Sequence, residues 1–301
     1  MSIAVTGTIT WRDLINEAAT RLAEQLGAPR RQEARWLVER VSGYASAELW
    51  KLGDEPVSTR SVAVFDQLVA RRCAGEPLQY VLGRWAFRSL ELVVDRSVLI
   101  PRPETELVAG LAIDAARVAE AKHGERALAV DLGTGSGAIA LSLAAEVPGL
   151  RVLAADVSED ALRVARANLA GIGGVAARRV RMHHGSWFDA LPQEVRGAID
   201  VLVSNPPYVG DDEREQMPRE VLDWEPHLAL FGGHDGTDAL RQLITGSPAW
   251  LRPGGTLVLE LAPRQTDWAA GLASDRGFVR AQIIDDLAGR PRALTATWEG
   301  E

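Results

Sequence analysis

Apolar residues in the first 80 positions recur at spacings of three and four, the period at which side chains share one face of an α-helix. The first such run starts at Thr10, and Asp13 three residues later completes the pattern of an N-terminal cap. Further helices are predicted at residues 30–41, 45–49 and 59–74. The pattern therefore indicates a small all-helical N-terminal domain, which we place at residues 1–84.

Short extended runs follow this helical pattern. Between residues 85 and 100, apolar and polar positions mix over stretches too short for helices, which predicts a β-hairpin linker at residues 85–100. Prolines at positions 101 and 103 interrupt the chain, and a long helix is predicted from about residue 105 to residue 122. A separate, larger domain is expected to begin here.

From residue 127 onward, apolar runs of strand length alternate with helical patterns. Runs such as AIDVLVSN and GTLVLEL predict strands that are covered on both faces, as in a parallel sheet between helices. The last two strands are joined by too short a segment for a crossover helix, so the final strand is expected to run antiparallel to its neighbour. We therefore predict an α/β fold at residues 101–301, a Rossmann-like domain with a mostly parallel seven-stranded sheet. Its strands are expected at residues 127–132, 151–157, 180–184, 199–204, 256–261, 280–285 and 293–298.

The segment DLGTGSGA, at residues 131–138, lies directly after the first predicted strand of this domain and before an apolar helix. Glycines allow a tight turn and a close approach of the backbone to a ligand, and the start of a helix offers free N–H groups. A nucleotide-like ligand is expected here. The candidate binding residues are Gly133, Thr134, Gly135, Ser136 and Gly137.

Two further residues lie at the carboxyl ends of the next strands. Asp156 ends the second strand, about 20 residues after the glycines, where a carboxylate can accept hydrogen bonds from both ribose hydroxyls. Its alternative role, a cap for the following helix, suits Ser158 better. Trp187 follows the third strand and can stack on an adenine ring, or alternatively seal the edge of the core.

The glycine segment alone leaves two ligand classes open. Gly133, Gly135 and Ala138 also satisfy the G-x-G-x-x-A fingerprint of dinucleotide-binding enzymes. Gly137, which places a third alternate glycine in the turn, and the acidic Asp131 resemble instead the S-adenosylmethionine loop of class I methyltransferases.

The segment Asn205-Pro206-Pro207-Tyr208 follows the fourth strand, at the same sheet edge as the glycines. A planar nitrogen conjugated to a carbonyl group or an aromatic ring is a poor nucleophile, so an enzyme must position it. The Asn205 side-chain oxygen and the Pro206 carbonyl can accept its two hydrogens, and the prolines hold the turn rigid. Tyr208 can pack against the conjugated group. We therefore take Asn205, Pro206 and Tyr208 as candidate catalytic residues and the whole segment as the substrate-binding turn, although Asn-Pro-Pro is also an ordinary turn sequence.

The charge, the cysteine content and the absence of long apolar runs argue against nucleic-acid, metal and membrane partners. With 41 acidic and 33 basic residues the net charge is −8, so no broad basic surface and no nucleic-acid substrate are expected. The single cysteine allows no internal disulfide, and no group of cysteines and histidines has zinc-ligand spacing, so no metal is expected. Because neither a signal-peptide pattern nor a membrane-length apolar run is found, a cytoplasmic protein without a membrane partner is expected.

Seven segments together resemble the release-factor glutamine methyltransferase family (PrmC/HemK type), over about residues 71–292. They are GEPLQYVLG (75–83), LIPRPETE (99–106), DLGTGSGAIALSLA (131–144), AADVSEDAL (154–162), SNPPYV (204–209), EPHLALFGGHDG (225–236) and DDLAGRPR (285–292). The Asn-Pro-Pro-Tyr turn is shared with adenine amino-methyltransferases, whereas LIPRPETE and GEPLQYVLG are not general methyltransferase features. The sequence departs from the family pattern at residues 260–265 and at residues 168–169; both are expected to lie outside the substrate-binding turn, so neither is expected to impair activity.

The resemblance implies a helical domain that docks a protein substrate, and a catalytic domain that uses S-adenosylmethionine and releases S-adenosyl-L-homocysteine. The implied substrate is the glutamine of the Gly-Gly-Gln tripeptide in class I peptide chain release factors, methylated on its side-chain nitrogen. By position, residues 133–137, Asp156, Trp187 and Asn205 would contact the cofactor, and residues 205–208 the glutamine.

Three other functions stay open at this point. The first is an adenine amino-methyltransferase acting on DNA or RNA, because the exocyclic nitrogen of adenine must be positioned in the same way. The acidic composition argues against this function. An NAD-dependent oxidoreductase would satisfy the dinucleotide fingerprint. A non-catalytic binding module would not need the Asn-Pro-Pro-Tyr turn.

Overall fold

The computed structural model describes residues 9–44 and 46–300. Residues 1–8, 45 and 301, which the predicted domains and the predicted helix at 45–49 include, lie outside the described residues. The chain divides into two compact units, residues 1–83 and residues 84–301. Each unit is described by itself.

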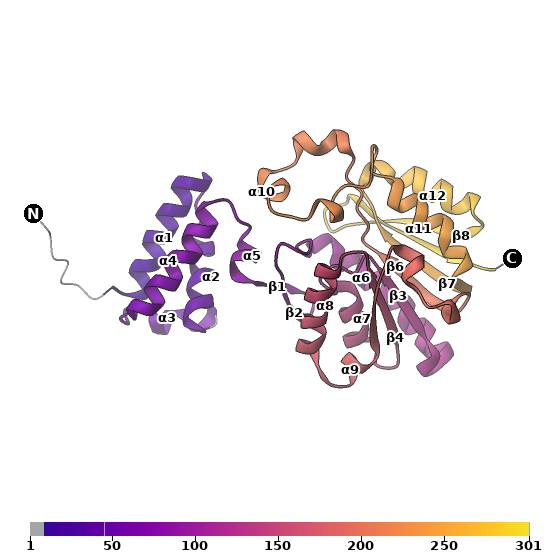
Figure 1. Ribbon diagram of the computed structural model, residues 1–301, viewed down its shortest axis with the longest axis horizontal. Coiled ribbons are helices and arrows are strands. Elements are labelled where there is room, and N and C mark those ends of the chain that lie inside the picture. The colour runs from indigo at the N-terminus through magenta and orange to yellow at the C-terminus, as the bar shows by residue number, and fades with distance from the viewer. Residues whose placement is uncertain (1–8, 45, 301) are drawn as a thin grey trace, which may run out of the picture. The chain divides into compact units, whose positions relative to one another are not determined.

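The first unit is helical, as its periodicity predicts (Figure 1). At its start, the Thr10 hydroxyl accepts a hydrogen bond from the Asp13 N–H, and the Asp13 carboxylate accepts one from the Thr10 N–H. This capping box confirms the expected helix start. Leu14, Leu22 and Phe65 are buried where the three longest helices of the unit, α1, α2 and α4, pack together. The described helices are α1 (Trp11–Leu26), α2 (Arg31–Ser42), η1 (Ser46–Glu48), α3 (Leu49–Leu52), α4 (Thr59–Cys73) and α5 (Leu78–Leu82).

A two-stranded hairpin opens the second unit. Strands β1 (Arg84–Phe87) and β2 (Leu90–Val93) pair antiparallel, while residues 94–100, which the sequence placed in the same hairpin, form no strand. Arg88 at the tip adopts a φ of 51° and forms an ion pair with Glu146. The hairpin is thereby fastened to the larger sheet domain.

Seven strands form one sheet within the described part of the chain, as predicted. They are β3 (Leu128–Leu132), β4 (Arg151–Asp156), β5 (Val180–His184), β6 (Ile199–Ser204), β7 (Leu251–Glu260), β8 (Phe278–Asp285) and β9 (Pro291–Trp298). Their order is β5-β4-β3-β6-β7-β9-β8, and β9 runs antiparallel to both of its neighbours. The expected reversal of the last strand is therefore confirmed.

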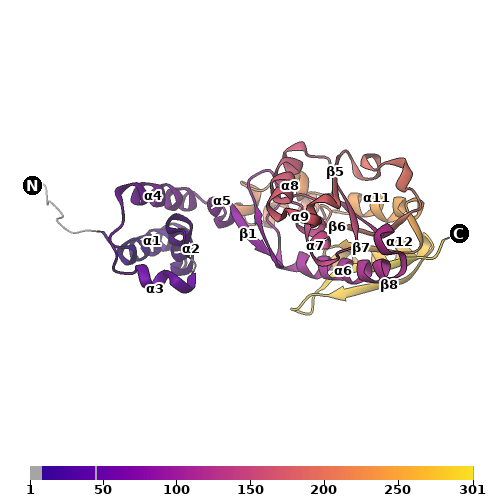
Figure 2. The same cartoon turned by 90° about the horizontal axis from the view of Figure 1, so that it is seen from below.

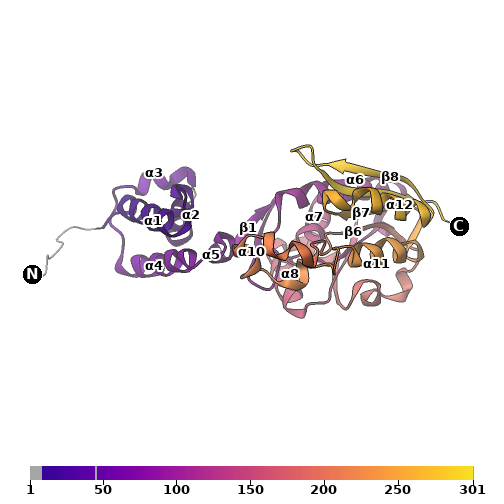
Figure 3. The same cartoon turned by 90° about the horizontal axis from the view of Figure 1, so that it is seen from above.

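Helices cover both faces of this sheet, and the side-chain alternation of β3 shows how. Leu128 and Val130 belong to the apolar cluster that includes α11 and α12, whereas Ala129 belongs to the cluster that includes α6 and α7. Figures 1, 2 and 3 show these two pairs of helices from three directions. The helices are α6 (Pro103–His123), α7 (Ala138–Glu146), α8 (Glu159–Ile172), α9 (Gly174–Arg178), α10 (Arg219–Leu222), α11 (Asp238–Gly246) and α12 (Thr266–Asp275). The short 3₁₀ turns are η2 (Gly124–Arg126), η3 (Trp187–Ala190), η4 (Gln193–Val195), η5 (Asp211–Gln216), η6 (His227–Ala229), η7 (Ser247–Ala249) and η8 (Pro263–Gln265).

Strand β3 lies between β4 and β6. From β3 the strands β4 and β5 follow on one side, and the chain then crosses back to place β6 on the other side of β3, so the strand order reverses at β3. In open α/β sheets a crevice forms at this point, beyond the carboxyl ends of the strands. Residues 205–237, called the excursion after β6 below, form a long connection between β6 and α11. Val209 near its start pairs with Phe231 near its end in an isolated parallel bridge, so both parts of the connection lie beside each other. The fold therefore brings the glycine segment, the turn after β6 and this excursion together.

Among the described residues, no helix is both long enough and apolar enough to cross a membrane.

Candidate active site

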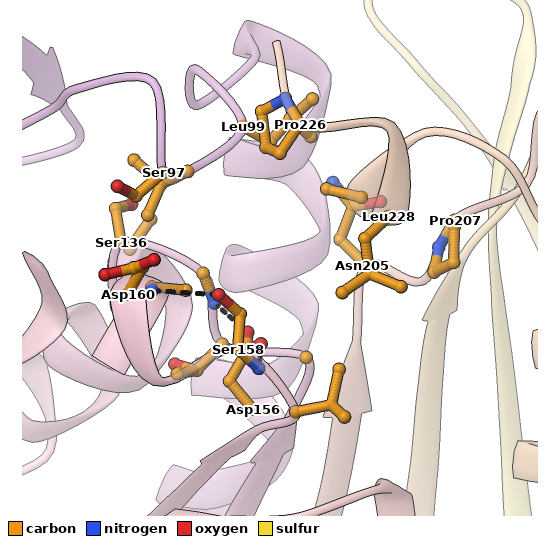
Figure 4. Close-up of a pocket in the computed structure, with 18 of the residues that line it drawn as sticks. Ser97, Leu99, Ser136, Asp156, Ser158, Asp160, Asn205, Pro207, Pro226 and Leu228 are labelled. Atoms are coloured by element: carbon orange, nitrogen blue, oxygen red, sulfur yellow. Dashed lines mark hydrogen bonds between the residues drawn. The ribbon is translucent and has the colours of Figure 1, made fainter. Parts of the chain in front are cut away.

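A cavity of about 560 Å³ lies at the carboxyl edge of the sheet. Its walls come from the ends of β3, β4, β5 and β6, from residues 96–101 and from residues 226–231. Figure 4 shows Asp156 and Asn205 reaching this cavity from different strands. The volume falls in the range of sites that enclose a small molecule or cofactor.

Three alternate glycines shape the turn after β3. Gly133, Gly135 and Gly137 have φ values of 74°, 56° and 85°, in the left-handed region that favours glycine. An added Cβ at Gly135 would meet no atom within 4 Å, so this part of the turn is open to a ligand. Gly137, in contrast, does not line the cavity: it is the N-cap of α7, and a Cβ there would lie 3.1 Å from Leu141 in the first turns of that helix.

The carboxyl group of Asp131 stabilises the glycine turn through hydrogen bonds to both of its ends. Its Oδ2 accepts hydrogen bonds from the Thr134 hydroxyl at 2.6 Å and the Ala140 N–H at 3.1 Å. Burial in an apolar environment raises the pKa of Asp131 to about 7. The acidic residue that the sequence singled out therefore supports the loop instead of facing the cavity.

Asp156 joins the ends of β3 and β4 and lines the cavity. Its Oδ2 accepts the Gly135 N–H at 2.8 Å and its Oδ1 accepts the Ser158 N–H at 2.9 Å. Ser158 is the N-cap of α8, since its hydroxyl accepts the Ala161 N–H. Desolvation raises the pKa of Asp156. Each carboxylate oxygen retains a lone pair for a ligand hydroxyl.

Trp187 begins η3, directly after β5, and lines the cavity beside the glycine turn. Its ring would lie 3.5 Å from a Cβ at Gly133, so the two residues are close neighbours. Its φ of 43° is unusual for a tryptophan, and such left-handed backbone costs on the order of 1 kcal/mol or more. Surrounding contacts therefore hold the ring at the cavity wall.

Only two of the four predicted substrate-binding residues in the turn after β6 line the cavity. Asn205 and Pro207 line it, whereas Pro206 is buried and neither Pro206 nor Tyr208 is among the lining residues. The Asn205 Nδ2 donates to the Thr105 hydroxyl at 3.1 Å, which leaves its Oδ1 available to a ligand. The Tyr208 hydroxyl donates to Glu260 Oε1 at 3.2 Å.

Sequence reasoning missed two residues behind this turn, Thr105 and Glu260. The Thr105 hydroxyl donates to Glu260 Oε2 at 2.8 Å, and burial raises the pKa of Glu260 to about 7. A signal was present in the sequence, because Glu260 is the lone charged residue in the apolar run GTLVLEL. The expectation that residues 260–265 lie outside the substrate-binding turn is therefore wrong: Glu260 accepts the Tyr208 hydroxyl, and Gln265 Nε2 donates to the Tyr208 carbonyl at 3.0 Å.

The excursion after β6 forms the outer wall of the cavity. Phe231 and Leu228 line it, and Leu228 remains largely exposed. Glu225 is buried and accepts a hydrogen bond from Arg102 at 2.5 Å, which joins the excursion to the start of α6. Arg96 lies 4.1 Å above the Trp224 ring and forms a second link.

Comparison with known proteins adds to this geometry. Residues 13–83 match the model of the PrmC N-terminal domain and residues 116–222 that of the methyltransferase small domain. The release factor glutamine methyltransferase of Streptomyces coelicolor is 41% identical over 283 residues, which cover 94% of this chain and 96% of that protein. That of Cereibacter sphaeroides is 39% identical, over 94% of this chain and 97% of the relative. The chain belongs to the release factor glutamine methyltransferase family.

Family membership confirms the resemblance drawn from seven segments and extends it into the helical unit, where the sequence offered only helical character. Solved structures agree with the fold. The catalytic domain of hMettl16, in complex with an RNA hairpin, superposes with a TM-score of 0.55 at 13% identity, over 88% of this chain and 92% of that one. A Pyrococcus furiosus methyltransferase gives 0.50 at 19% identity, over 77% and 98%. These two proteins have little sequence identity to the chain, so the comparison shows that the α/β fold is shared with more distant proteins.

Proposed function

We propose that this protein transfers a methyl group from S-adenosylmethionine to the side-chain nitrogen of the glutamine in the Gly-Gly-Gln tripeptide of class I peptide chain release factors. The observation that carries the proposal is a single cavity lined by both Asp156 and Asn205. A ligand that bonds Asp156 through its ribose and a carboxamide held by Asn205 would then share one enclosed space. The relatives from Streptomyces coelicolor and Cereibacter sphaeroides are named for the same substrate, a release factor glutamine.

The cavity fits S-adenosylmethionine on three counts. The open turn at Gly135 admits close approach, Asp156 offers acceptors for ribose hydroxyls, and Trp187 offers an aromatic face for adenine. When bound, S-adenosylmethionine supplies an electrophilic methyl group and leaves as S-adenosyl-L-homocysteine. No group of histidine, cysteine and carboxylate side chains in the described ranges is arranged to hold a metal ion.

The turn after β6 would hold the glutamine. Because Asn205 Nδ2 is already bonded to Thr105, its Oδ1 is the atom that would accept one amide hydrogen of the substrate. The Pro206 carbonyl is the proposed second acceptor, although Pro206 is buried and is not among the residues that line the cavity. Two acceptors fix the direction of the nitrogen lone pair without demanding a strong base. Orientation of reacting atoms can lower a barrier by roughly 7 to 11 kcal/mol in favourable cases.

The helical unit would dock the release factor, and the reaction would take place in the cytoplasm. The model of the PrmC N-terminal domain covers this unit, from residue 13 to residue 83. The net charge of −8 supports a protein substrate over a nucleic acid.

The test is mass spectrometry of a purified release factor after incubation with this protein and S-adenosylmethionine. We expect one added methyl group, located by fragmentation on the glutamine of the tripeptide. A release factor with that glutamine replaced by alanine is the matched control and should stay unmodified. Methyl label in nucleic acid, with the release factor unlabelled, would instead support an adenine amino-methyltransferase.

A further inference from the structure

A continuous hydrogen-bond chain runs behind the substrate turn. Asn205 Nδ2 donates to Thr105 Oγ1 at 3.1 Å, and Thr105 Oγ1 donates to Glu260 Oε2 at 2.8 Å. The other oxygen of Glu260 accepts the Tyr208 hydroxyl at 3.2 Å. Glu260 is fully buried, whereas Thr105, which is 4% exposed, and Asn205 line the cavity, so the chain runs from the cavity wall to a carboxylate that water does not reach. Three separate segments therefore meet at one carboxylate.

The chemistry of these groups gives the chain a direction. A carboxylate only accepts hydrogen bonds, and a threonine hydroxyl has a single proton. Since Thr105 gives this proton to Glu260, its oxygen can only accept from Asn205. The Asn205 carboxamide must then turn its NH₂ group toward Thr105 and its oxygen away from it.

We propose that Thr105 and Glu260 are positioning residues for methyl transfer: they set the direction of this chain so that Asn205 presents its oxygen, and not its NH₂ group, to the substrate. The inference rests on the proposed function, in which the substrate offers N–H hydrogens. The two ends of a carboxamide have nearly the same shape, so sterics alone do not choose between them. A reversed Asn205 would set two donors against each other.

The same device selects glutamine over glutamate. A substrate carboxylate has no hydrogens for Asn205 Oδ1 and is repelled by that oxygen, whereas a reversed Asn205 would donate to it. The state of Glu260 decides which arrangement is favoured. Burial and the nearby Glu104 raise the pKa of Glu260, to about 7, while Arg292 on β9 and the bonds from Thr105 and Tyr208 oppose the rise. A protonated Glu260 could donate to Thr105 and allow the chain to reverse.

The experiment compares Thr105→Val, Thr105→Ser and Glu260→Gln with the wild type. Thr105→Val keeps the shape but removes the hydroxyl, and we expect kcat/KM for the release factor to fall about tenfold or more. Thr105→Ser restores the hydroxyl and should restore most of the activity. A release factor carrying glutamate in place of the glutamine should inhibit Thr105→Val more strongly than the wild type.

A pH profile supplies the second readout. Wild-type kcat/KM should decline on the acid side, with a midpoint at or below about pH 7, since a bound sulfonium favours the charged carboxylate. Glu260→Gln should lose both this acid limb and most of the turnover. Ser247→Ala is the control: it removes another fully buried hydroxyl, bonded to the Ile244 carbonyl near the start of β7, away from the cavity.

The outcomes separate the two proposals. If the wild type leaves the release factor unmethylated, the proposed function fails. If the wild type is active but Thr105→Val, Thr105→Ser and Ser247→Ala have the same kcat/KM and the same inhibition by the glutamate factor, the positioning role fails. Should Glu260→Gln not fold, the threonine pair and the inhibitor still decide.

Discussion

Gly135 donates its backbone N–H to Oδ2 of Asp156 across 2.8 Å, so the glycine turn after β3 and the carboxyl end of β4 are joined at the cavity. The bond fixes the carboxylate at the cavity wall. One interaction therefore shapes the turn and prepares the proposed ribose site. Loss of the Asp156 carboxylate should therefore weaken cofactor binding while the protein still folds.

We predict that Asp156→Ala weakens binding of S-adenosyl-L-homocysteine by about 1 to 3 kcal/mol, because charge-assisted hydrogen bonds to the ribose are lost. Isothermal titration calorimetry measures this change. Glu159→Ala is the matched control, since its carboxylate is exposed and paired with Arg166 on the same helix. Equal affinities for Asp156→Ala and the wild type would remove Asp156 from the cofactor site.

Asn205→Ala should reduce turnover of the release factor about a hundredfold or more, because one of the two acceptors for the substrate amide disappears. The side chain is only half-buried and comes from a turn, so the melting temperature should change little. Turnover is measured at saturating S-adenosylmethionine, which separates this effect from cofactor affinity. Near-normal turnover would contradict the proposed clamp.

Gly232→Ala should disturb the substrate turn from the opposite side. A Cβ at this position would lie 2.3 Å from the Pro207 carbonyl oxygen, a backbone atom that cannot move without moving the turn. We expect methyl transfer to fall much more than affinity for S-adenosyl-L-homocysteine, measured on the same preparation. Gly271→Ala, on α12 with no atom within 4 Å of the added Cβ, is the control and should stabilise the protein by up to about 1 kcal/mol. Parallel losses of activity and cofactor affinity in Gly232→Ala would argue against a selective role.

Much of this site could be predicted because its residues follow buried strands. The positions of Asp156, Trp187 and Asn205 at the carboxyl edge follow from strand order in an open α/β sheet, and the structure places all three on one cavity. The pair Thr10 and Asp13 also predicted the helix cap, and the short connection between the last two strands predicted the reversal of the last strand; both are found.

Other contacts could not be derived from local patterns. Thr105 and Glu260 are separated by 155 residues, and only tertiary packing brings the start of α6 to the end of β7. The packing of the Tyr208 ring against a substrate stays a prediction, but the bond of its hydroxyl to Glu260, 52 residues away, could not be derived from the sequence. The spacing of Gly137 predicts a ligand contact, but this residue does not line the cavity, and its φ of 85° and the closeness of Leu141 to an added Cβ account for a glycine there.

The buried Asp131 should make the free energy of unfolding depend on pH. Its pKa rises from 3.8 to about 7 on folding, mainly through burial, so between these pH values the folded protein keeps a proton that the unfolded chain has released. The stabilising contribution is complete below the unfolded pKa and is lost as the pH rises through the folded pKa. No described residue offers a hydrogen bond to Oδ1, which also favours the neutral carboxyl group.

We therefore predict that Asp131→Asn, which cannot titrate, loses less stability than the wild type between pH 5 and pH 7. The difference in slope should be up to about 1.4 kcal/mol per pH unit, measured by denaturant unfolding of the ligand-free protein. Asp156, Glu225 and Glu260 have raised pKa values as well and titrate in both proteins. The charge of Asp156 contributes to the raised pKa of Asp131, so the difference in slope includes the interaction between these two carboxyl groups. Asp114→Asn, on a side chain that is 75% exposed, should follow the wild type. If Asp131→Asn and the wild type give parallel curves, Asp131 is already ionised when the protein is folded, and the glycine turn is supported by a charge.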